Sequence, residues 1–470
     1  AIGFYYAVVS GWTLKYFQLG ITGALNGDKV DTTEVWNAFL QSSGQVIFFQ
    51  FVVILLVLGT IWKGAKAIEK VNFYLMISLF ALLFLTLFLS LWMDLSDGSL
   101  DGALFMFTVD FDMLLEPEVW INGLSQSAWS CSAGMGMCIT YAVYMSKDED
   151  TVLNAFTMGL ANNSISIIAG LAVLSAIFAV NPDPLATVTG GSSAITFLAL
   201  PEVFAQAPGG AIGPLIMTAM FFLALSFAAL TSMISTVELC VRNFVDHGYD
   251  RERSVLITGL AIFIFGIPSA VMWIKFDSAG VAFPEFLEVQ DHIWGYGLMF
   301  SGLFIAFSIW KYGYIKWRKA VEEGTAVPGF AGYLGLGVSA FRDDFINTGD
   351  NDLEVGRWWD VLIYIAFPVL FFILMASYFS DMIANTPNVW DPSNPKGLSI
   401  ILLFWGVVAA LFIVLNKKLI ERPLFRNVPE GADADISELP GGSDDLIGQV
   451  GDVIAGFEHL TASVDAELAD

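Results

Sequence analysis

The sequence predicts an all-α, polytopic membrane protein. Of its 470 residues, 56% are hydrophobic and 40 are Phe, which is more apolar surface than a soluble domain of this size would need. The mean hydropathy is +0.68. Ten segments are predominantly apolar over the roughly 20 residues that a membrane-spanning helix requires. They are residues 1–23, 44–62, 71–94, 119–145, 153–181, 210–241, 254–275, 290–314, 357–381 and 397–417.

Lys and Arg are distributed unevenly among the loops that join these segments. The chain has 21 of them, and 17 fall in alternate loops. The other loops hold only Lys29, Lys275 and Lys396, while Lys15 lies near the end of the first segment. Because positive residues are enriched in cytoplasmic loops, the pattern predicts ten spans in a cell membrane with both chain ends cytoplasmic.

The first segment has an unusual start. The chain opens with AIGFYYAVVSGW, directly inside a predicted span and without an initiating Met. No signal peptide is visible, so we expect the sequence to begin at a cut within a longer chain.

Apolar length alone predicts the segments 44–62, 71–94, 254–275, 290–314, 357–381 and 397–417.

The fourth segment, 119–145, is polar in its middle. The stretch SQSAWSCSAGMGMCITYAVY (125–144) has four serines followed by Gly134 and Gly136. It can be a helix interrupted within the membrane, where non-helical backbone survives only if protein or water covers it. It can equally be a small-residue face on which helices pack closely. An interruption would free backbone groups at two half-helix ends, which suit ions and a charged substrate group.

Two further segments carry polar side chains at comparable depth. GLANNSISIIAG places Asn162 and Ser166 one turn apart, and AALTSMISTVE contains Thr231, Ser232 and Glu238. A hydroxyl in a membrane helix usually donates to a carbonyl of its own helix. Three segments with neutral oxygens nevertheless favour a hard-cation site, for sodium rather than calcium. Glu238, the only acid well inside a segment, is either a proton or ion relay or a carboxylate solvated near the cytoplasmic vestibule.

Other residue types weigh against other functions. Cys131, Cys138 and Cys240 fall within predicted spans, where packing is their expected role. The three His residues lack metal-ligand spacing, and we find neither a nucleophile–base arrangement nor a phosphate loop, so we expect no enzyme. The net charge of −25 disfavours a nucleic-acid partner.

Acidic residues are concentrated near the end of the chain. Residues 427–470 contain 11 acids and neither Lys nor Arg. We therefore divide the chain into a transmembrane domain, 1–421, and an acidic cytoplasmic tail, 422–470, which is expected to be disordered or weakly helical. The tail can be a regulatory arm. A solvated acidic surface suited to high salt is the preferred interpretation, and it indicates a halophilic prokaryote, a haloarchaeon, as the source.

Five motifs occur in the order in which a known family has them. They are YYAVVSGWTL, VWINGLSQSAWSCSAGMGMCITYAVYMSKDED, GLANNSISIIAG, FLALPEVFAQAPGG and AALTSMIS. The chain resembles the neurotransmitter:sodium symporters, also called sodium- and chloride-dependent transporters. The resemblance implies the family's twelve-helix fold with an inverted five-plus-five repeat, of which ten helices are present, from the third onward. The first two helices, with their share of the substrate and sodium sites and the outer-gate arginine, would be missing, so we expect a fragment.

The resemblance also implies roles for individual residues. Residues of the first, fourth and sixth segments match the family's substrate site: Ile2, Tyr6, Trp129, Ser132, Met135, Ser232 and Thr236. Tyr6 and Trp129 further match the aromatic part of the outer gate, and Asp291 matches its acid. Trp129 replaces the usual Phe and Met135 a common aromatic residue, so the pocket is expected to differ in shape.

Two sodium sites follow from the same resemblance. Ser130 and Asn162 match two ligands of the first. The carbonyl of Ala228 and the hydroxyls of Thr231 and Ser232 match the second, and these three residues lie on one helical face.

A chloride site is also implied, because Ser166 stands where chloride-independent bacterial members place a carboxylate. Gln126, Ser130, Asn162 and Ser166 together resemble the chloride-dependent pattern. Sodium in a low-dielectric site needs a compensating negative charge, which bound chloride would supply. Alternatively, Ser166 only packs, and another acid or a proton-coupled cycle supplies the charge.

The function implied is sodium-coupled, chloride-dependent symport of a small amino acid or related amine by alternating access. The loop FLALPEVFAQAPGGAIG resembles the family's external hairpin over the substrate vestibule. The alternative is a transporter-like sensor that binds ligand without net flux and signals through its acidic tail. The position that distinguishes amino-acid from amine carriers would lie in the missing first helix, so the sequence does not identify the substrate.

Overall fold

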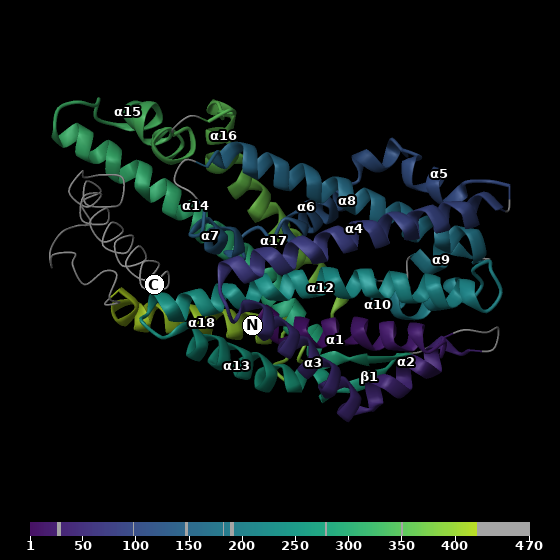
Figure 1. Ribbon diagram of the computed structural model, residues 1–470. Helices are drawn as coiled ribbons and strands as arrows, with labels where there is room; N and C mark the ends of the chain where they lie inside the picture. Colours follow the sequence, from purple (N-terminus) through teal and green to yellow (C-terminus); the bar gives the residue numbers. More distant parts are fainter. Residues whose placement is uncertain are drawn as a thin grey trace, which may run out of the picture. The chain divides into compact units, whose positions relative to one another are not determined.

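The fold is all-α, as the sequence predicts (Figure 1). The computed structural model describes residues 1–25, 30–96, 98–145, 149–181, 183–188, 192–277, 280–348 and 351–420. The acidic tail, His459, Lys29 and Lys147 lie outside this range. Among the described residues, the strands β1 (Ile274–Phe276) and β2 (Ala282–Pro284) form one antiparallel pair, with Lys275 opposite Phe283.

Most of the α-helices match predicted spans or lie in the connections between them. Their bounds are α1 (Ile2–Ile21), α2 (Thr32–Gln41), α3 (Ser43–Ile61), α4 (Ala65–Ser96), α5 (Asp101–Phe107), α6 (Pro117–Ser130), α7 (Met137–Ala142), α8 (Thr151–Val180), α9 (Pro184–Val188), α10 (Ser192–Ala194), α11 (Leu200–Phe204), α12 (Ile212–Asp246), α13 (Arg251–Val271), α14 (Glu285–Glu322), α15 (Phe330–Gly332), α16 (Arg357–Val361), α17 (Phe367–Asn385) and α18 (Leu398–Ile420).

Five short helical segments of other types complete the described chain. A 3₁₀ turn, η1 (Asp112–Leu115), precedes α6. The other four are π-helical: η2 (Ile195–Ala199), η3 (Tyr333–Gly337), η4 (Arg342–Ile346) and η5 (Leu362–Ala366). We call the continuous piece formed by α10, η2 and α11 the α10–α11 segment (192–204).

All ten predicted spans are helical, and eight helices in the described part of the chain are long and apolar enough to cross a membrane. The two exceptions are α1 and the predicted span 119–145, which is divided between α6 and α7. The middle of α1 carries Ser10, Gly11 and Thr13, all of them buried. A helix that is enclosed by protein needs less apolar surface than one that faces lipid.

The chain forms two compact units. The larger contains the described residues of 1–147, 156–302 and 372–412, and the smaller contains those of 148–155, 303–371 and 413–470. In the larger unit α1 packs against α3, α12 and α13. Glycine permits this close approach, since a Cβ on Gly11 would lie 2.9 Å from the backbone nitrogen of Gln50.

An aromatic cluster joins the α10–α11 segment to α1 and α2 of the larger unit. The Phe197 ring stacks on Trp36, with centroids 5.1 Å apart, and meets the Trp12 ring edge-on at 5.8 Å. Tyr16 and Phe222 complete the cluster. Aromatic pairs of this kind contribute about 0.5–1.5 kcal/mol each beyond their buried area, so the α10–α11 segment is firmly seated.

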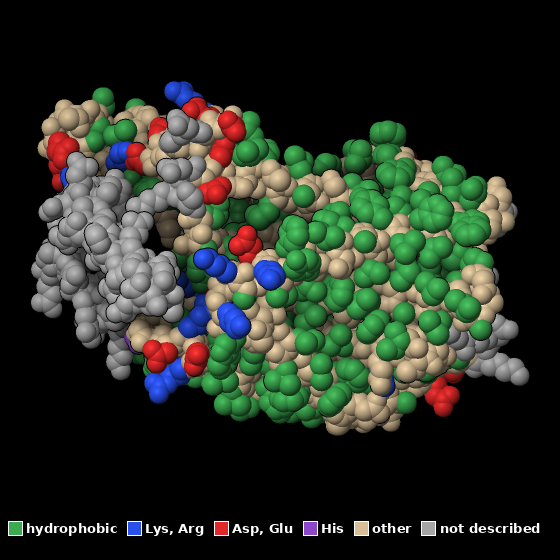
Figure 2. Space-filling view, viewed as in Figure 1, with side chains coloured by type: hydrophobic (Ala, Val, Ile, Leu, Met, Phe, Trp, Pro, Cys, Tyr) green, Lys and Arg blue, Asp and Glu red, His purple; other side chains and the backbone are tan. Residues whose placement is uncertain are grey.

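The surface of the larger unit is largely apolar. Figure 2 shows hydrophobic side chains over most of the visible face of α1, α4 and α12. Lys and Arg side chains gather near the start of α4 and the end of α12 in the same view. This separation of apolar sides from charged ends is what a lipid-facing helical protein requires.

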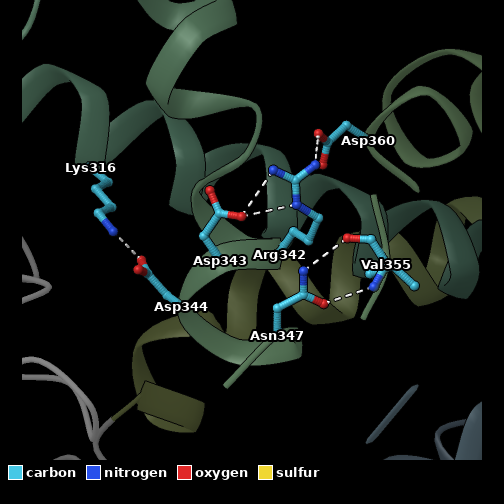
Figure 3. A network of polar contacts seen from close by, with 7 residues as sticks. All are labelled: Lys316, Arg342, Asp343, Asp344, Asn347, Val355 and Asp360. Carbon is cyan, nitrogen blue, oxygen red and sulfur yellow. Dashed lines mark hydrogen bonds and ion pairs between the residues drawn. The ribbon is translucent and has the colours of Figure 1, made fainter. Parts of the chain in front are cut away.

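Ion pairs organise the smaller unit (Figure 3). The Arg342 guanidinium lies between two carboxylates, at 2.5 Å from Asp360 and 2.9 Å from Asp343. Asp344 pairs with Lys316 of α14, and the Asn347 amide exchanges two hydrogen bonds with the Val355 backbone. These contacts hold η4 against α14 and α16, and they hold Asn347 against Val355.

The start of α8 also belongs to the smaller unit. Asp150 caps this helix by accepting a hydrogen bond from the Leu153 N–H at 2.8 Å. Its second carboxylate oxygen accepts from the Leu353 N–H at 3.1 Å. One side chain therefore ties α8 to the connection between η4 and α16.

Candidate functional site

The predicted interruption of segment 119–145 is present. α6 ends at Ser130 and α7 begins at Met137. Between them, Ser132, Gly134 and Gly136 have φ values of 55°, 77° and 79°. This left-handed region is readily adopted by glycine and is uncommon for other residues, so the helix stops where the sequence places its two glycines.

The small-residue interpretation also holds, at one of the same glycines. A Cβ on Gly134 would lie 2.8 Å from the backbone nitrogen of Gly302 and 3.1 Å from the Leu298 carbonyl oxygen. The interruption therefore meets α14 backbone to backbone. Gly136 is less confined, because its nearest neighbour is the Leu239 side chain at 3.2 Å.

The end of α6 meets α8 at two residues that are predicted for both the first sodium site and the chloride site. The Asn162 amide donates to the Ser130 hydroxyl at 2.7 Å, and it lies 3.8 Å from the Cys131 sulfur. Gln126 and Ser166 are exposed and lie one turn from Ser130 and Asn162, respectively. Of the four residues predicted for chloride, two therefore form a contact between α6 and α8, and the other two lie one turn from it on the same helices.

Three oxygens predicted for the second sodium site converge on α12. The Thr231 and Ser232 hydroxyls donate to the Ala228 carbonyl, at 2.9 and 3.1 Å. Each hydroxyl is thus bonded within its own helix, as is common in membrane helices. A hydroxyl that donates its proton keeps two acceptor lone pairs, so these oxygens can still face a cation.

A cavity of about 260 Å³ lies between α1, α12 and the α10–α11 segment. It brings together three predicted residues, Tyr6, Ala228 and Ser232. The sequence reasoning missed the further hydroxyls in its wall. These belong to Ser10, Thr13, Ser193 and Thr196.

Helical periodicity could have found part of this set. Ser10 lies four residues after Tyr6, and Thr13 lies seven residues after Tyr6, so all three are on one face of α1. The Ser226 hydroxyl of α12 donates to Thr13 at 3.1 Å and so joins the two helices. No side chain in the cavity wall is charged among the residues that the structure describes.

The predicted gate residues Trp129 and Asp291 both lie at the first turns of α14. A Cβ on Gly295 would lie 2.7 Å from the Trp129 ring, so this ring packs one turn beyond Asp291. The Asp291 carboxylate lies near the buried hydroxyl of Tyr5, and this hydroxyl has no regular hydrogen bond to any described residue. Tyr5 therefore faces Asp291, whereas Tyr6 faces the cavity. α14 begins at Glu285, so Asp291 lies in its second turn.

The remaining predicted substrate residues are spread over the start of α1, the interruption and α12. Ile2 packs at the edge of the aromatic core cluster. The Thr236 hydroxyl donates to the Ser232 carbonyl at 2.9 Å and lies 3.8 Å from the Met137 sulfur. Ser132 and Met135 are half-buried within the interruption. None of these residues lines the 260 Å³ cavity.

Glu238 is fully buried and paired, so of the two alternatives for this residue the solvated carboxylate is wrong. The Arg251 guanidinium donates to both of its oxygens, at 3.0 and 2.7 Å. The Tyr144 hydroxyl donates to the same carboxylate at 2.6 Å. Arg251 also donates twice to the carbonyl of Ile61, the last residue of α3. The cluster thus ties the turn after α7, together with α12 and α13, to the end of α3.

A second tyrosine strengthens the attachment of α7. Tyr141 lies in the last turn of α7, three residues before Tyr144, which lies in the turn that follows the helix. Its hydroxyl is 2.9 Å from the Ser235 hydroxyl of α12. The short helix after the interruption and the turn that follows it are therefore each held to α12 by one tyrosine hydroxyl.

The polar groups at the predicted ion sites are neutral hydroxyl, amide and carbonyl oxygens, and the charged Glu238 of α12 is paired with Arg251. No group of three or more His, Cys, Asp or Glu side chains in this part of the chain could hold a metal ion. Cys131 and Cys138 are exposed, so the packing role predicted for them is wrong. Cys240 is half-buried, and all three cysteines are free.

Comparison with known proteins adds independent information. A model described as the Sodium:neurotransmitter symporter family matches residues 37–333, more than half of the chain. The "Uncharacterized sodium-dependent transporter YhdH" of Bacillus subtilis is 29% identical, over 65% of this chain and 67% of its own length. The "Uncharacterized sodium-dependent transporter MJ1319" of Methanocaldococcus jannaschii is 28% identical, over 77% and 62%. The chain thus spans about two thirds or less of the length of these relatives.

A solved structure has a similar fold. The crystal structure of MhsT in complex with L-phenylalanine superimposes with a TM-score of 0.61 at 26% sequence identity. The match covers 80% of this chain and 79% of that one.

Proposed function

The chain belongs to the sodium:neurotransmitter symporter family, and we propose that it couples sodium entry to the uptake of a small amino acid or related amine. The family is one of transporters, so the protein is not an enzyme. The observation that carries the proposal is the placement of Tyr6, Ala228 and Ser232 on one cavity. Ala228 and Ser232 also belong to the cluster of α12 oxygens proposed for sodium, so substrate and ion would bind side by side.

The wall of the cavity supports a small, uncharged side chain on the substrate. Its polar groups are hydroxyls and its other residues are apolar, such as Val9, Phe197 and Leu225. A carboxylate or amine on the substrate would need further partners, and the freed backbone between Ser130 and Met137 supplies groups of that kind. L-phenylalanine, the ligand of the MhsT complex, supports an amino acid.

Sodium is proposed to bind as a co-substrate at two places. One is the Ser130–Asn162 contact and the other is the α12 group of Ala228, Thr231 and Ser232. Neutral hydroxyl, amide and carbonyl oxygens are suitable ligands for a hard cation. The gradient of this ion would drive alternating access, with Tyr6, Trp129 and Asp291 closing the outer side.

Chloride is proposed to bind near the first sodium place, at Gln126, Ser130, Asn162 and Ser166. The support is their arrangement around one contact between α6 and α8, which offers hydroxyl and amide donors to an anion. With a serine at 166, no carboxylate at this position supplies the compensating charge. Uptake should therefore fall when gluconate replaces chloride, and uptake that is unaffected would sink the chloride proposal.

The proposed orientation places both ends of this chain in the cytoplasm. Lys63, Lys66 and Lys70 lie at the junction of α3 and α4, and Arg251 and Arg253 begin α13. The positive-inside rule puts both groups on the cytoplasmic side. The Glu238–Arg251 cluster would then close the inner end of the larger unit.

The test is uptake of radiolabelled amino acids by the full-length protein in proteoliposomes. An inward sodium gradient should drive accumulation, and an equal potassium gradient should not. Alanine at Ser232 should raise the sodium concentration for half-maximal uptake, whereas alanine at Ser308, a hydroxyl on α14 bonded to its own helix, should not. Saturable ligand binding without net flux would instead establish the sensor function.

A further inference from the structure

A second cavity, of about 330 Å³, has no role in the proposed transport cycle. It lies in the larger unit, between the end of α4, the loop after α11 and the start of α12. Leu89, Trp92 and Met93 form one side, and Pro208, Ile212 and Ile216 are on the other. Of the residues that line it, only Trp92 carries a side-chain nitrogen or oxygen. The volume is at the lower end of the range of about 300–1,000 Å³ typical of ligand pockets.

The cavity borders the surface that faces lipid. α4 and α12 are both long and apolar enough to span a membrane, and only 11% of the most apolar stretch of α4 is buried. Trp92 is 56% exposed and Ile212 is 67% exposed at the rim. Trp is typical of the membrane interface. The solvent at this opening is therefore the hydrocarbon near one face of the bilayer.

We propose that this cavity binds one acyl chain of a membrane phospholipid. An unfilled apolar space forfeits dispersion contacts along its wall, and hydrocarbon is the medium outside. A free fatty acid fits less well, because its carboxylate would need a cation. The sequence has neither Lys nor Arg from 71 to 146 or from 148 to 241, a range that includes every residue of the cavity wall. A phospholipid instead keeps its charged group in the interface.

Occupancy of the cavity bears on the α10–α11 segment. Met93, Ala207 and Met217 line the cavity and also belong to the core cluster beneath this segment, with Leu200 and Phe204. The same segment carries Thr196 and Phe197 into the wall of the 260 Å³ cavity. A bound acyl chain therefore stabilises the cover of the proposed substrate cavity. This part of the inference rests on the proposed function, whereas acyl-chain binding does not.

The loop after α11 can pass this stabilisation on to the α10–α11 segment, because the loop packs tightly against α12. A Cβ on Gly213 would lie 2.0 Å from the Pro208 carbonyl oxygen, so the loop rests directly on the first turn of α12. Gly209 has a φ of 115°, which favours glycine. The loop therefore shifts together with the end of α11 and the start of α12.

Photo-crosslinking tests the binding. The full-length protein is placed in nanodiscs that contain a trace of phosphatidylcholine with a diazirine on one acyl chain, and labelled peptides are mapped by mass spectrometry. Labels should concentrate on Leu89–Met93 and Ile212–Met217. Ile216→Trp, which fills the cavity, should lower labelling of Leu89–Met93 several-fold. Leu260→Trp, at an exposed apolar position of α13 away from the cavity, should leave it unchanged. Ile216→Phe repeats the test if the Trp variant does not fold.

Three outcomes would contradict the proposal. Labels spread evenly over the lipid-facing helices would indicate surface lipid alone. Labelling by a diazirine fatty acid but not by the phospholipid would indicate a free acid. In the third outcome, Ile216→Trp loses the cavity label, but residues 192–204 exchange hydrogen at the same rate as in the unaltered protein. This result would show that the cavity is not coupled to the α10–α11 segment. None of these measurements needs transport, so failure of the proposed function would be seen separately.

Discussion

Removal of the Arg251 side-chain charge should destabilise the protein more than any surface charge change. Arg251→Met leaves the Glu238 carboxylate, which is 0% exposed, with the Tyr144 hydroxyl as its remaining partner of those described above. It also removes both side-chain hydrogen bonds to the Ile61 carbonyl at the end of α3. Breaking a buried ion pair by removing one partner costs about 3–5 kcal/mol, and we expect a loss in that range.

The opposite change should cost less, because the two partners differ in exposure. In Glu238→Gln, the Arg251 side chain is 25% exposed and keeps its bonds to Ile61. Its charge is therefore partly solvated, and we expect a loss of about 1–3 kcal/mol, the range for an unsatisfied hydrogen-bonding group. The double variant should cost less than the sum of the two, since no unpaired buried charge remains.

Equilibrium unfolding in mixed micelles measures these free energies, with sodium-dependent uptake followed in parallel. The matched control is Arg318→Met, which removes a guanidinium that is 63% exposed and pairs with Glu322 one turn away. Such a surface pair contributes about 0.3–0.5 kcal/mol. Equal losses for Arg251→Met and Arg318→Met, or strictly additive losses in the double variant, would refute the reasoning.

Three other predictions concern single positions. Backbone N–H groups, first that of Leu153 and also that of Leu353, lower the pKa of the Asp150 carboxyl. The stabilisation is therefore present above its ordinary pKa of about 3.9 and is lost as the pH falls through the lower folded value. Asp150→Asn should weaken the tie at neutral pH and accelerate hydrogen exchange at Leu353, whereas equal exchange in both proteins at pH 7 would contradict it. Gly134→Ala should lower the yield of folded protein on size exclusion, because its φ is 77° and backbone lies within 3.1 Å of the added Cβ. Gly123→Ala, which meets nothing within 4 Å, is its control. Asn162→Ala should raise the sodium concentration for half-maximal uptake. Unlike Arg251→Met, it should leave the melting temperature unchanged. Unchanged sodium dependence would argue against a ligand role for Asn162.

The helices of this fold are predictable because a membrane leaves the chain few alternatives. Backbone groups in hydrocarbon must bond within their own segment, so apolar length alone locates most spans. The interruption was also visible, since Gly134 and Gly136 supply positive φ at low cost. Hydropathy was least informative for α1, whose buried polar middle is enclosed by α3, α12 and α13.

Contacts that depend on helix rotation could not be predicted in the same way. Tyr5 and Tyr6 are adjacent, and only the packing of α1 decides that Tyr5 faces Asp291 while Tyr6 faces the cavity. The pairing of Glu238 with Arg251 could not be predicted from the sequence either. Arg251 reads as an ordinary positive residue at a helix start, and its bonds to Ile61 depend on where α3 ends.

The contact between Gly134 and Gly302 changes how scanning mutagenesis should be interpreted in this protein. Alanine substitution normally deletes atoms and reports what a side chain contributed. Here both partners present only backbone, so alanine adds a methyl group to a site with no room for it. A scan would therefore record a large effect at a junction that has no side-chain interaction to lose. The informative variants are those that remove bulk elsewhere on α14 and let the crowded junction relax.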